Sequence, residues 1–503
     1  MALPRNKTKI VATIGPASEA PETLERLIRA GLNIARLNFS HGDFTSHAER
    51  IRRIRSAAEV VGRRVAIMAD LPGPKMRIGK IEDEPIELHS GENFILTTEE
   101  IAGSPQRVSV SFKRLPQVVK PGDRLFLNDG LLQLTVEHVS GSEVHCKVSV
   151  GGELRSKKGL NLPGIALGIG AFTAHDRACL EFALREGVDA VSQSFVETGG
   201  DIEAVRAAAS DAGKRPFIVA KIERLDAVRN FDDILNASDG IMLARGDLGV
   251  EVPIEEMAIL QKRLLVRARI ACKPVITATH MLESMVASRL PTRAEATDVA
   301  NAVLDGTDAV MLSGESAIGK YPEEAMAMLA KIAAYTESQC PLADPSELRS
   351  RPRHGLPGTG DDAIAYVVEA ALDSIPCAAA FVPTRSGATA RTISRLRHPA
   401  LWIVALSRDP AVCQGLAFSY GVEPVQLVEE PKNWREFAQS WLREHQVPGS
   451  MALLVAGPSV GNPGANYRLE FLNVREFAKE ANTGDLLSRR FSSPVTQNDA
   501  VVR

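Results

Sequence analysis

The chain has 503 residues, which is too long for one compact core, so its length predicts two or three domains. Its 59 basic and 62 acidic residues give a net charge of −3, which offers no electrostatic reason to expect nucleic acid or an anionic membrane as a partner. Hydrophobic residues make up 45% and charged residues 24%, as in an ordinary globular protein.

The six cysteines form no CxxC pair and no metal-ligand spacing; they are Cys146, Cys179, Cys272, Cys340, Cys377 and Cys413. Scattered thiols of this kind are typical of a reducing compartment. The sequence shows neither a signal peptide nor an apolar stretch long enough to span a bilayer. We therefore expect a cytoplasmic protein.

The first and middle parts of the chain alternate short β-branched apolar runs with longer amphipathic segments. The predicted strands are Lys9–Gly15, Asn33–Phe39, Val65–Leu71, Ala190–Val196, Phe217–Glu223, Gly240–Gly246, Pro274–Thr279 and Ala309–Gly314. A helical pattern follows each strand except the third; after the seventh, Pro291 to Glu295 predicts a capped helix start. Eight such units favour a closed (β/α)8 barrel over an open doubly wound sheet. We assign residues 1–71 and 170–340 to this barrel.

Between the third strand and its helix the pattern changes to short strands separated by Gly-Asp, Asp-Gly and Gly-Gly turns. The strands expected there are Asn93–Thr97, Arg107–Ser111, Asp123–Leu127, Leu132–Val136 and Val144–Val150. We expect residues 72–169 to form an inserted β domain at the carboxyl end of the barrel, where barrel enzymes build their sites.

A segment rich in Pro, Arg and Gly, Cys340–Gly360, is expected to link the barrel to a third, α/β domain at 341–481. Its expected strands are Ala378–Val382, Leu401–Ala405, Val425–Leu427 and Met451–Ala456. The polar residues 482–503 are expected to form a loosely ordered tail.

Polar side chains occupy the ends of six predicted barrel strands. They include Arg36, Asp70, Lys221, Glu223, Asp247, Thr279 and Ser313. Each alone is most simply a solvated side chain, and His41 is more simply structural or a phosphate neighbour than a general base. Together they favour one shared mouth that holds cations, carboxylates and hydroxyls without a cysteine or serine–histidine nucleophile. Such a set suits phosphoryl transfer, in which fixed cations and metal ions stabilise a transition state with dispersed negative charge.

Within this set, Glu223 and Asp247 are the candidate ligands of a hard divalent cation, and Arg36 and Lys221 supply positive charge. One other motif, from Gly314 to Lys320, fits the GxxxxGK pattern of a P-loop. Tyr321 and Pro322 follow it instead of the expected Ser or Thr, and the proline predicts a helix that starts after the lysine. A P-loop is therefore disfavoured.

Long strings of this sequence resemble the pyruvate kinase family, in the family's own order. They are RLNFSHG (36–42), KGLNLPG (158–164), KIE (221–223), MLARGDLGVE (242–251), PVITATHMLESM (274–285), PTRAE (291–295), DVANAVLDG (298–306) and MLSGE (311–315). The resemblance implies a magnesium-dependent enzyme (Mg²⁺ or Mn²⁺) that transfers the phosphoryl group of phosphoenolpyruvate to ADP in glycolysis. It also implies a homotetramer.

The resemblance assigns roles to matching positions. Lys221 and Arg36 would face the phosphoryl group, and Glu223 and Asp247 would hold the metal. The substrate carboxylate would be held by the amides of Ala244, Gly246 and Asp247 together with Thr279. Asn38, His41, Arg77 and Lys158 would lie near the nucleotide phosphates, and the inserted domain would close over them. Thr279 and Ser313 are both candidates for the relay that protonates the pyruvate enolate.

The sequence departs from the family after the third strand, where Asp-Thr-Lys-Gly-Pro-Glu is usual and Asp70-Leu71-Pro72-Gly73-Pro74-Lys75 stands here. The family's potassium site matches Asn38, Ser40, Asp70 and Leu71, with the glutamate at Lys75. A lysine ammonium there could replace the monovalent ion, so we expect that K⁺ is not required. His280, where the family usually has Gln, has no assigned consequence.

In the third domain, Thr384-Arg385-Ser386-Gly387-Ala388-Thr389 follows a strand and opens a helix. The resemblance implies that Thr384, Arg385, Ser386, Gly387 and Thr389 bind a phosphorylated allosteric effector, and the alternatives are a sugar phosphate, a nucleotide monophosphate or no effector at all. A plain capped helix start is the alternative. The partner loop, GPSVGNPGAN (457–466), is less typical of the family.

Two other functions compete with this interpretation. A metal-dependent barrel lyase or aldolase would share the carboxylates, but the inserted domain and Lys221 argue against it, and dependence on ADP would discriminate. A catalytically silent effector-binding protein on the same scaffold is disfavoured because no key position is lost.

Overall fold

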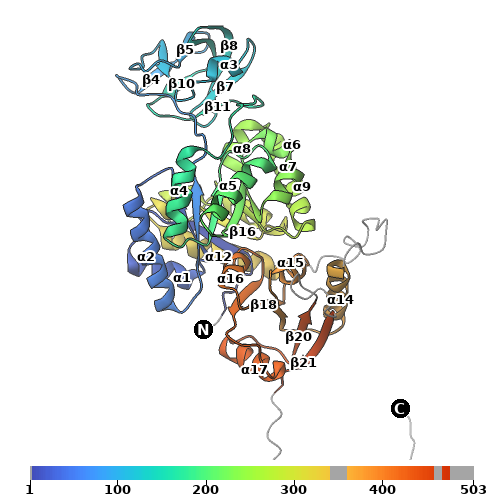
Figure 1. The fold of residues 1–503 in the computed structure, drawn as a ribbon. Helices are drawn as coiled ribbons and strands as arrows, with labels where there is room; N and C mark the ends of the chain where they lie inside the picture. Colours follow the sequence, from blue (N-terminus) through green and yellow to red (C-terminus); the bar gives the residue numbers. More distant parts are fainter. Residues whose placement is uncertain (1–2, 340–359, 458–466, 476–503) are drawn as a thin grey trace, which may run out of the picture.

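The computed structural model describes residues 3–339, 360–457 and 467–475. Residues 340–359 of the expected linker, the expected tail, and nearly all of the loop at 457–466 lie outside these ranges. Three bodies are stacked along one axis (Figure 1): a β domain at the top of the picture, a barrel in the middle, and an α/β domain below it.

The central body is a closed barrel of eight parallel strands, as predicted. In chain order these are β1 (Lys9–Thr13), β2 (Ile34–Asn38), β3 (Ala66–Leu71), β12 (Ala190–Gln193), β13 (Phe217–Ile222), β14 (Gly240–Ala244), β15 (Val275–Ala278) and β16 (Ala309–Leu312). Their order around the barrel is the chain order, and β1 closes it by pairing with both β2 and β16. Each strand lies within a range expected from the apolar runs.

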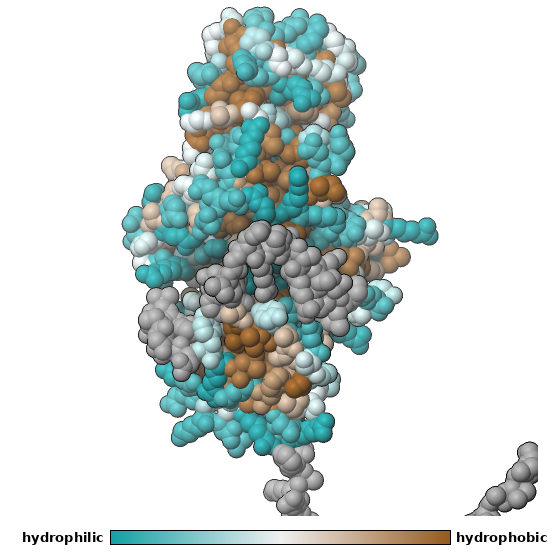
Figure 2. Space-filling view, turned by 90° about the vertical axis from the view of Figure 1, so that its right-hand side faces the viewer, coloured by the Kyte–Doolittle hydropathy of each residue, from teal (hydrophilic) through white to brown (hydrophobic). Residues whose placement is uncertain are grey.

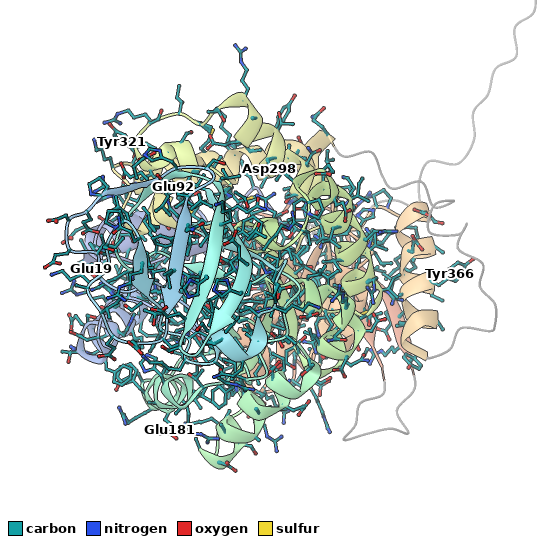
Figure 3. The ribbon with its side chains drawn as sticks, turned by 90° about the horizontal axis from the view of Figure 1, so that it is seen from above. Glu19, Glu92, Glu181, Asp298, Tyr321 and Tyr366 are labelled. Carbon is teal, nitrogen blue, oxygen red and sulfur yellow. The ribbon has the colours of Figure 1, made fainter. Side chains whose placement is uncertain are left out.

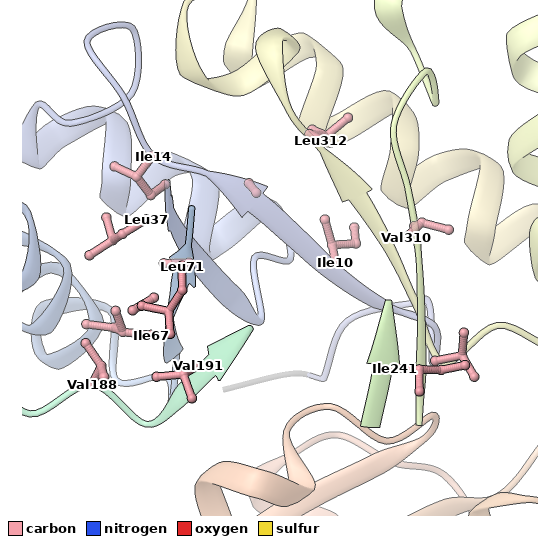
Figure 4. Packing of buried hydrophobic residues seen from close by; sticks show 14 of the residues in the cluster. Ile10, Ile14, Leu37, Ile67, Leu71, Val188, Val191, Ile241, Val310 and Leu312 are labelled. Atoms are coloured by element: carbon pink, nitrogen blue, oxygen red, sulfur yellow. The ribbon is translucent and has the colours of Figure 1, made fainter. Parts of the chain in front are cut away.

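Alternation along the strands divides their side chains between two layers. Ile10, Leu37, Ile67, Val191 and Ile241 belong to the hydrophobic layer between the strands and the surrounding helices (Figure 4). The intervening residues form a second apolar cluster inside the barrel, including Val11, Ile34, Met68, Val219 and Met242. Because successive side chains of a strand point to opposite faces, the residues that continue this inner set toward the carboxyl ends must face the mouth.

Helices surround the barrel and connect its strands. They are α1 (Pro21–Ala30), α2 (Phe44–Val61), α4 (Ala174–Arg185), α5 (Gly199–Asp211), α6 (Leu225–Arg229), α7 (Phe231–Ala237), α8 (Arg245–Glu251), α9 (Met257–Ile270), α10 (Arg293–Leu304), α11 (Gly314–Ala317) and α12 (Pro322–Gln339). Leu24, Leu27 and Ile28 are the buried face of α1. The expected cap of α10 is present, with Thr292 and Glu295 forming a capping box. Helix α12 begins at Pro322, after the lysine of the GxxxxGK string as predicted, and Tyr321 stands where a P-loop has Ser or Thr.

The β domain lies between β3 and α4 and holds its own hydrophobic core. Its main sheet contains β5 (Asn93–Thr97), β6 (Arg107–Ser109), β7 (Arg124–Leu127), β8 (Leu132–Ser140), β9 (Glu143–Val150) and β11 (Leu160–Asn161), with the short helix α3 (Leu115–Val118) beside it. A separate pair joins β4 (Ile86–Leu88) to β10 (Gly152–Leu154). Seen from above, these strands lie over the barrel (Figure 3). The strands β4, β10 and β11 escaped the sequence pattern because each has only two or three residues.

The C-terminal domain is a five-stranded sheet with helices around it. Its elements are α14 (Gly360–Ser374), β17 (Ala379–Pro383), α15 (Ala388–Ser394), β18 (Trp402–Ser407), α16 (Pro410–Leu416), β19 (Val422–Gln426), α17 (Trp434–Glu444), β20 (Met451–Ala456) and β21 (Arg468–Asn473). Helix α14 with its Tyr366 lies at the side of the molecule, away from the barrel axis (Figure 3). Phe418 follows α16 and joins the apolar cluster inside the barrel.

Two sequence predictions in this domain need correction. The third strand begins at Val422 rather than Val425, because Val422 and Glu423 already pair with Ile403 and Val404. The antiparallel edge strand β21 was missed, since its exposed outer face lacks the apolar run used to find strands. Both are edge strands, which carry the weakest hydrophobic signal.

Within the part of the chain that the structure describes, no helix is long and apolar enough to cross a membrane. Five of the six cysteines fall in this part, and all five are free thiols. Cys340 lies outside the described residues.

Candidate active site at the carboxyl end of the barrel

The side chains that point into the barrel at the carboxyl ends of β2, β3 and β13 form a polar inner layer that is nearly closed to solvent. Arg36, Asp70 and Lys221 each have an exposed fraction of 9% or less. They occupy inward positions of β2, β3 and β13, each two residues or more beyond an apolar inward residue such as Ile34 or Val219. The strand alternation that fills the barrel interior therefore also brings these charges together at its upper end.

Asp70 is the centre of this layer. Its carboxylate accepts a hydrogen bond from Arg36 Nε at 2.8 Å and another from Ser192 Oγ at 2.7 Å, and Lys221 Nζ lies 3.4 Å away. Burial alone would raise the pKa of Asp70, but Lys221 and Arg36 outweigh it and hold that pKa below its usual value. The carboxylate is therefore ionised and fixes the directions of both cations.

Lys221 lies between two carboxylates. Its ammonium donates to Ser194 Oγ at 2.7 Å and forms an ion pair with Glu223 Oε1 at 2.8 Å, in addition to Asp70. Burial opposes the charge, but Asp70 and Glu223 dominate together and raise the pKa of Lys221. The side chain thus stays protonated and suits electrostatic stabilisation of an anion rather than proton abstraction.

Glu223 and Asp247 form the acidic side of the mouth. The buried Glu223 carboxylate accepts from Phe195 N at 2.7 Å through its second oxygen. Burial raises the pKa of Glu223, and repulsion from Asp247 raises it further. Two repelling carboxylates, one buried, fit a hard divalent cation that would relieve the repulsion.

No group of three or more Cys, His, Asp or Glu side chains with metal-site geometry occurs among residues 3–339, 360–457 and 467–475. A cation held by Glu223 and Asp247 would need further ligands besides these two carboxylates, and Mg²⁺ commonly takes such ligands from substrate oxygens and water.

The turn that ends β14 and begins α8 is braced from the next strand. Arg245 donates to both oxygens of Asp298, at 2.8 and 2.7 Å, and to the Thr279 carbonyl at 2.8 Å. Gly246 N donates to Thr279 Oγ1 at 2.7 Å. Thr279 and His280 both have positive φ, 69° and 55°, a strained conformation for residues other than glycine that often marks functional sites. Ala244, Gly246, Asp247 and Thr279 thus lie in one small region, where the Thr279 hydroxyl accepts from the Gly246 amide and donates to the Ala278 carbonyl at 2.7 Å.

Residues expected near a nucleotide lie where the barrel meets the β domain. Asn38 ends β2, and its side chain accepts from Ser40 N at 3.0 Å. Burial, followed by the charges of Lys75, Arg77 and Arg36, lowers the pKa of His41. Arg77 pairs with Gly159 across the base of the β domain and donates to the Lys157 carbonyl at 2.8 Å. Lys158 belongs to the same base, where its carbonyl accepts from Ile78 N.

The residues expected to surround a monovalent ion lie in two different environments. Asn38, Ser40 and Asp70 lie at the mouth, whereas the Leu71 side chain is fully buried in the outer hydrophobic layer, so only its backbone could face an ion. Lys75 is exposed and close enough to His41 to act on its charge. Among the residues that the structure describes, no carboxylate forms an ion pair with Lys75.

Ser313 ends β16, and its amide donates to the Glu315 carboxylate at 2.7 Å. Glu315 also accepts from Leu282 N at 3.1 Å, so it ties the end of β16 to the loop after β15. In the C-terminal domain, Thr384 Oγ1 accepts from Gly387 N at 2.9 Å, while Arg385 and Ser386 are exposed and Thr389 is buried.

Sequence reasoning did not single out Thr13, Ser192, Ser194 or Asp298. Thr13 accepts from Arg36 Nη1 at 2.7 Å, so it is the second support of that guanidinium. Ser192 and Ser194 lie at and just beyond the end of β12, and their polar side chains were the available signal. Asp298 lies on α10, and nothing in its helical pattern indicates its contact with Arg245.

A closed (β/α)8 barrel with a charged inner layer at its carboxyl end, and with a β domain inserted beside that layer, defines a barrel enzyme of the phosphotransferase class. A family model described as "Pyruvate kinase, barrel domain" matches residues 5–326, and one described as "Pyruvate kinase, alpha/beta domain" matches residues 362–467. The chain belongs to the pyruvate kinase family.

Individual relatives agree over most of the chain. A pyruvate kinase of Thermococcus litoralis is 51% identical over 433 residues, which cover 85% of this chain and 90% of that relative. A pyruvate kinase of Geobacillus stearothermophilus is 42% identical and covers 92% of this chain and 79% of its own length. A solved pyruvate kinase structure from Cryptosporidium parvum superposes with a TM-score of 0.86 at 35% identity, covering 94% of this chain and 97% of that one.

Proposed function

We propose that this enzyme transfers the phosphoryl group of phosphoenolpyruvate to ADP, giving pyruvate and ATP as a step of glycolysis in the cytoplasm. The observation that carries the proposal is the buried cluster in which Asp70 orients Arg36 and Lys221 beside the Glu223 carboxylate. A dispersed negative charge placed above this cluster meets two fixed cations without reorganising them.

In this proposal Arg36 binds the phosphate of phosphoenolpyruvate, and Lys221 faces the phosphoryl group as it moves. Glu223 and Asp247 would hold Mg²⁺ or Mn²⁺, which supplies positive charge to the phosphoryl oxygens when bound. The carboxylate of the substrate would sit against the amides of Ala244, Gly246 and Asp247 and the Thr279 hydroxyl, which already lies 2.7 Å from Gly246 N.

ADP would lie between the barrel mouth and the inserted β domain. Asn38, His41, Arg77 and Lys158 would face its phosphates, and closure of the β domain would exclude water from the transferring group. Either Thr279 or Ser313 would take part in the relay that protonates the enolate left behind. Both end strands at the mouth, Thr279 after β15 and Ser313 after β16.

We further propose that K⁺ is not required, that a phosphorylated effector binds the loop of Thr384, Arg385, Ser386, Gly387 and Thr389, and that the enzyme is a homotetramer. For K⁺, the support is the exposed Lys75 ammonium near His41 at the mouth. For the effector, it is the exposed pair Arg385 and Ser386 beside the turn closed by Thr384 and Gly387.

The direct test couples pyruvate formation to lactate dehydrogenase with phosphoenolpyruvate, ADP and MgCl₂. We expect turnover that disappears when ADP is omitted. Lys221→Met should abolish turnover while leaving Mn²⁺ binding, followed by electron paramagnetic resonance, largely intact. Lys214→Met, at an exposed lysine after α5, is the matched control and should behave as the wild type. Near-normal turnover of Lys221→Met, or pyruvate formation without ADP, would refute the proposal.

A further inference from the structure

The chain leaves the β domain and returns to the barrel through residues 164–171, which we call the return segment. Three of its side chains belong to the β domain. Leu167 is buried in the hydrophobic core of that domain, and Ile165 and Ile169 pack against the same core. Any group of the barrel that holds the return segment therefore holds the β domain as well.

Arg224 contacts the return segment from the end of β13. Its Nη2 donates to the Ile165 carbonyl at 2.9 Å, and its Nε lies 3.3 Å from the Glu197 carboxylate. The guanidinium can serve both partners because its N–H groups form a fixed planar fork. The side chain is only 3% exposed, so these two partners rather than solvent fix its direction. Arg224 directly follows Glu223, one of the two candidate metal ligands.

Glu251 approaches the start of the return segment from the end of α8. Its buried carboxylate accepts from Leu225 N at 3.3 Å. Burial raises the pKa of Glu251, whereas Arg224 and hydrogen bonds from the amides of Leu225 and Gly164 act in the opposite direction. Because Gly164 is the first residue of the return segment, Glu251 faces an amide of this segment while Arg224 binds the carbonyl of the next residue.

Helix α8 also meets the β domain at a second point. The turn between β7 and β8 lies against it, since a Cβ atom placed on Gly130 would be 3.4 Å from Val250 Cγ1. Gly130 has a φ of 89°, a conformation that favours glycine. Figure 1 shows α8 at the top of the barrel, directly below the β domain. The last turn of α8 thus contacts the β domain, while Asp247 in its first turn belongs to the candidate metal site.

Arg224 is shared by two carboxylates in this buried cluster. Burial raises the pKa of both Glu197 and Glu251, and the charge of Arg224 opposes that effect at each of them. Asp226 raises both pKa values further. Removing the cation would leave buried acidic groups without compensation, which is strongly destabilising. Substitutions that keep the charge or the shape of each side chain are therefore the informative ones.

We propose that Arg224 and Glu251 are positioning residues that tether the return segment of the β domain to the end of β13 and to α8, the two elements beside which Glu223 and Asp247 lie. The tether sets where the β domain stands above the barrel mouth. This inference deepens the proposed function and rests on it, because there ADP lies between the mouth and the β domain, whereas phosphoenolpyruvate lies on the barrel alone.

Steady-state kinetics of the full-length enzyme tests this role. Arg224→Lys keeps the charge but loses the planar fork that reaches Ile165, and Glu251→Gln keeps the shape but loses the charge. Each should raise KM for ADP about tenfold, as expected for a lost charge-assisted hydrogen bond, with less than about a twofold change in KM for phosphoenolpyruvate. The matched controls are Arg229→Lys in α6 and Glu255→Gln in the short helix after α8. Both side chains are exposed, and both variants should behave as the wild type.

Hydrogen–deuterium exchange of the ligand-free enzyme, followed by mass spectrometry, gives a readout that does not depend on activity. The peptide that contains Gly164 and Ile165 should exchange faster in both variants, because its backbone loses a partner in the barrel. Peptides of β8 and β9 should exchange as in the wild type, since the β domain keeps its own core.

Unchanged exchange of the return segment, or an equal rise of both KM values, would overturn the tether. Loss of Mn²⁺ binding by either variant without ADP, followed by electron paramagnetic resonance, would also overturn it, because the residue would then support the metal site instead. A wild type without ADP-dependent turnover would refute the proposed function, and the exchange experiment would still decide whether Arg224 and Glu251 hold the return segment.

Discussion

Buried charges in the barrel mouth support one another through short hydrogen bonds to neutral side chains. Lys221 is held by Ser194 as well as by Glu223, and Arg36 by Thr13 as well as by Asp70. A buried ion pair alone stabilises little, because desolvation offsets its attraction. The hydroxyl partners therefore serve mainly to direct the cations.

Ser194→Ala should lower kcat roughly tenfold with a smaller effect on KM, because one charge-assisted hydrogen bond to Lys221 is lost while Asp70 and Glu223 keep it in place. Steady-state kinetics with phosphoenolpyruvate and ADP measures this. Ser210→Ala, at an exposed serine of α5, is the control. An unchanged kcat in Ser194→Ala would show that this hydroxyl does not position the lysine.

A change of charge at Lys75 tests the proposal that the enzyme does not require K⁺. The wild type should be equally active in KCl and in tetramethylammonium chloride. Lys75→Glu should lose activity without K⁺ and regain it with K⁺, because the carboxylate replaces a positive charge with a cation ligand. Lys80→Glu carries the same charge change at another exposed lysine near the base of the β domain and should stay independent of K⁺. Strong activation of the wild type by K⁺ would contradict the proposal.

At the scale of single elements, helix α10 links the capping box at its own N-terminus to the candidate active site. The Glu295 carboxylate closes the capping box with Thr292 and also accepts from Ser284 N at 2.7 Å. One turn further along, Asp298 receives Arg245. Because a helix is rigid over one turn, the start of α10 sets the position of Asp298 and thereby of the turn at Gly246.

Thr292→Ala should lower the apparent Tm of the barrel by about 2–4 °C, because loss of an N-cap costs about 1 kcal/mol. Differential scanning calorimetry measures the shift. The control is Thr297→Ala in the same helix, where the hydroxyl only donates back to the Arg293 carbonyl and the change should be close to neutral. Equal shifts in the two variants would argue against a role for the cap.

At the scale of the whole molecule, Arg397 connects the C-terminal domain to the barrel. Its guanidinium donates to the Thr307 carbonyl at 2.7 Å, lies 3.0 Å from Asp308, and packs over the Tyr420 ring at 4.4 Å. The Phe418 side chain, two residues before Tyr420, enters the apolar interior of the barrel. The hydrophobic surfaces of the barrel and the C-terminal domain are therefore joined (Figure 2 shows one face of this stacked molecule).

Arg397→Met should weaken this junction, so that calorimetry resolves separate unfolding transitions for the C-terminal domain and the barrel where the wild type gives overlapping ones. Arg408→Met, at an exposed arginine of the C-terminal domain, is the control and should keep the wild-type profile. A single unchanged transition in Arg397→Met would show that apolar packing alone joins the two domains.

The sequence by itself determined the barrel, the inserted β domain and most strands of the C-terminal domain. Burial of one or both faces of a strand or helix produces a local hydrophobic periodicity, and turn residues mark where each element ends. The same periodicity placed Arg36, Lys221 and Glu223 at strand ends. It did not indicate the short strands β4, β10 and β11 or the edge strand β21, whose local signals are weak.

Only the tertiary structure decided that Asp70 joins Arg36, 34 positions away, to Lys221, 151 positions away, and that Ser194 and Asp298 support the mouth. It also decided that Arg224 and Glu251 of the barrel meet the return segment of the β domain. The physical reason is common to these cases: such contacts depend on how the barrel closes and how the domains dock, and no short segment carries that information.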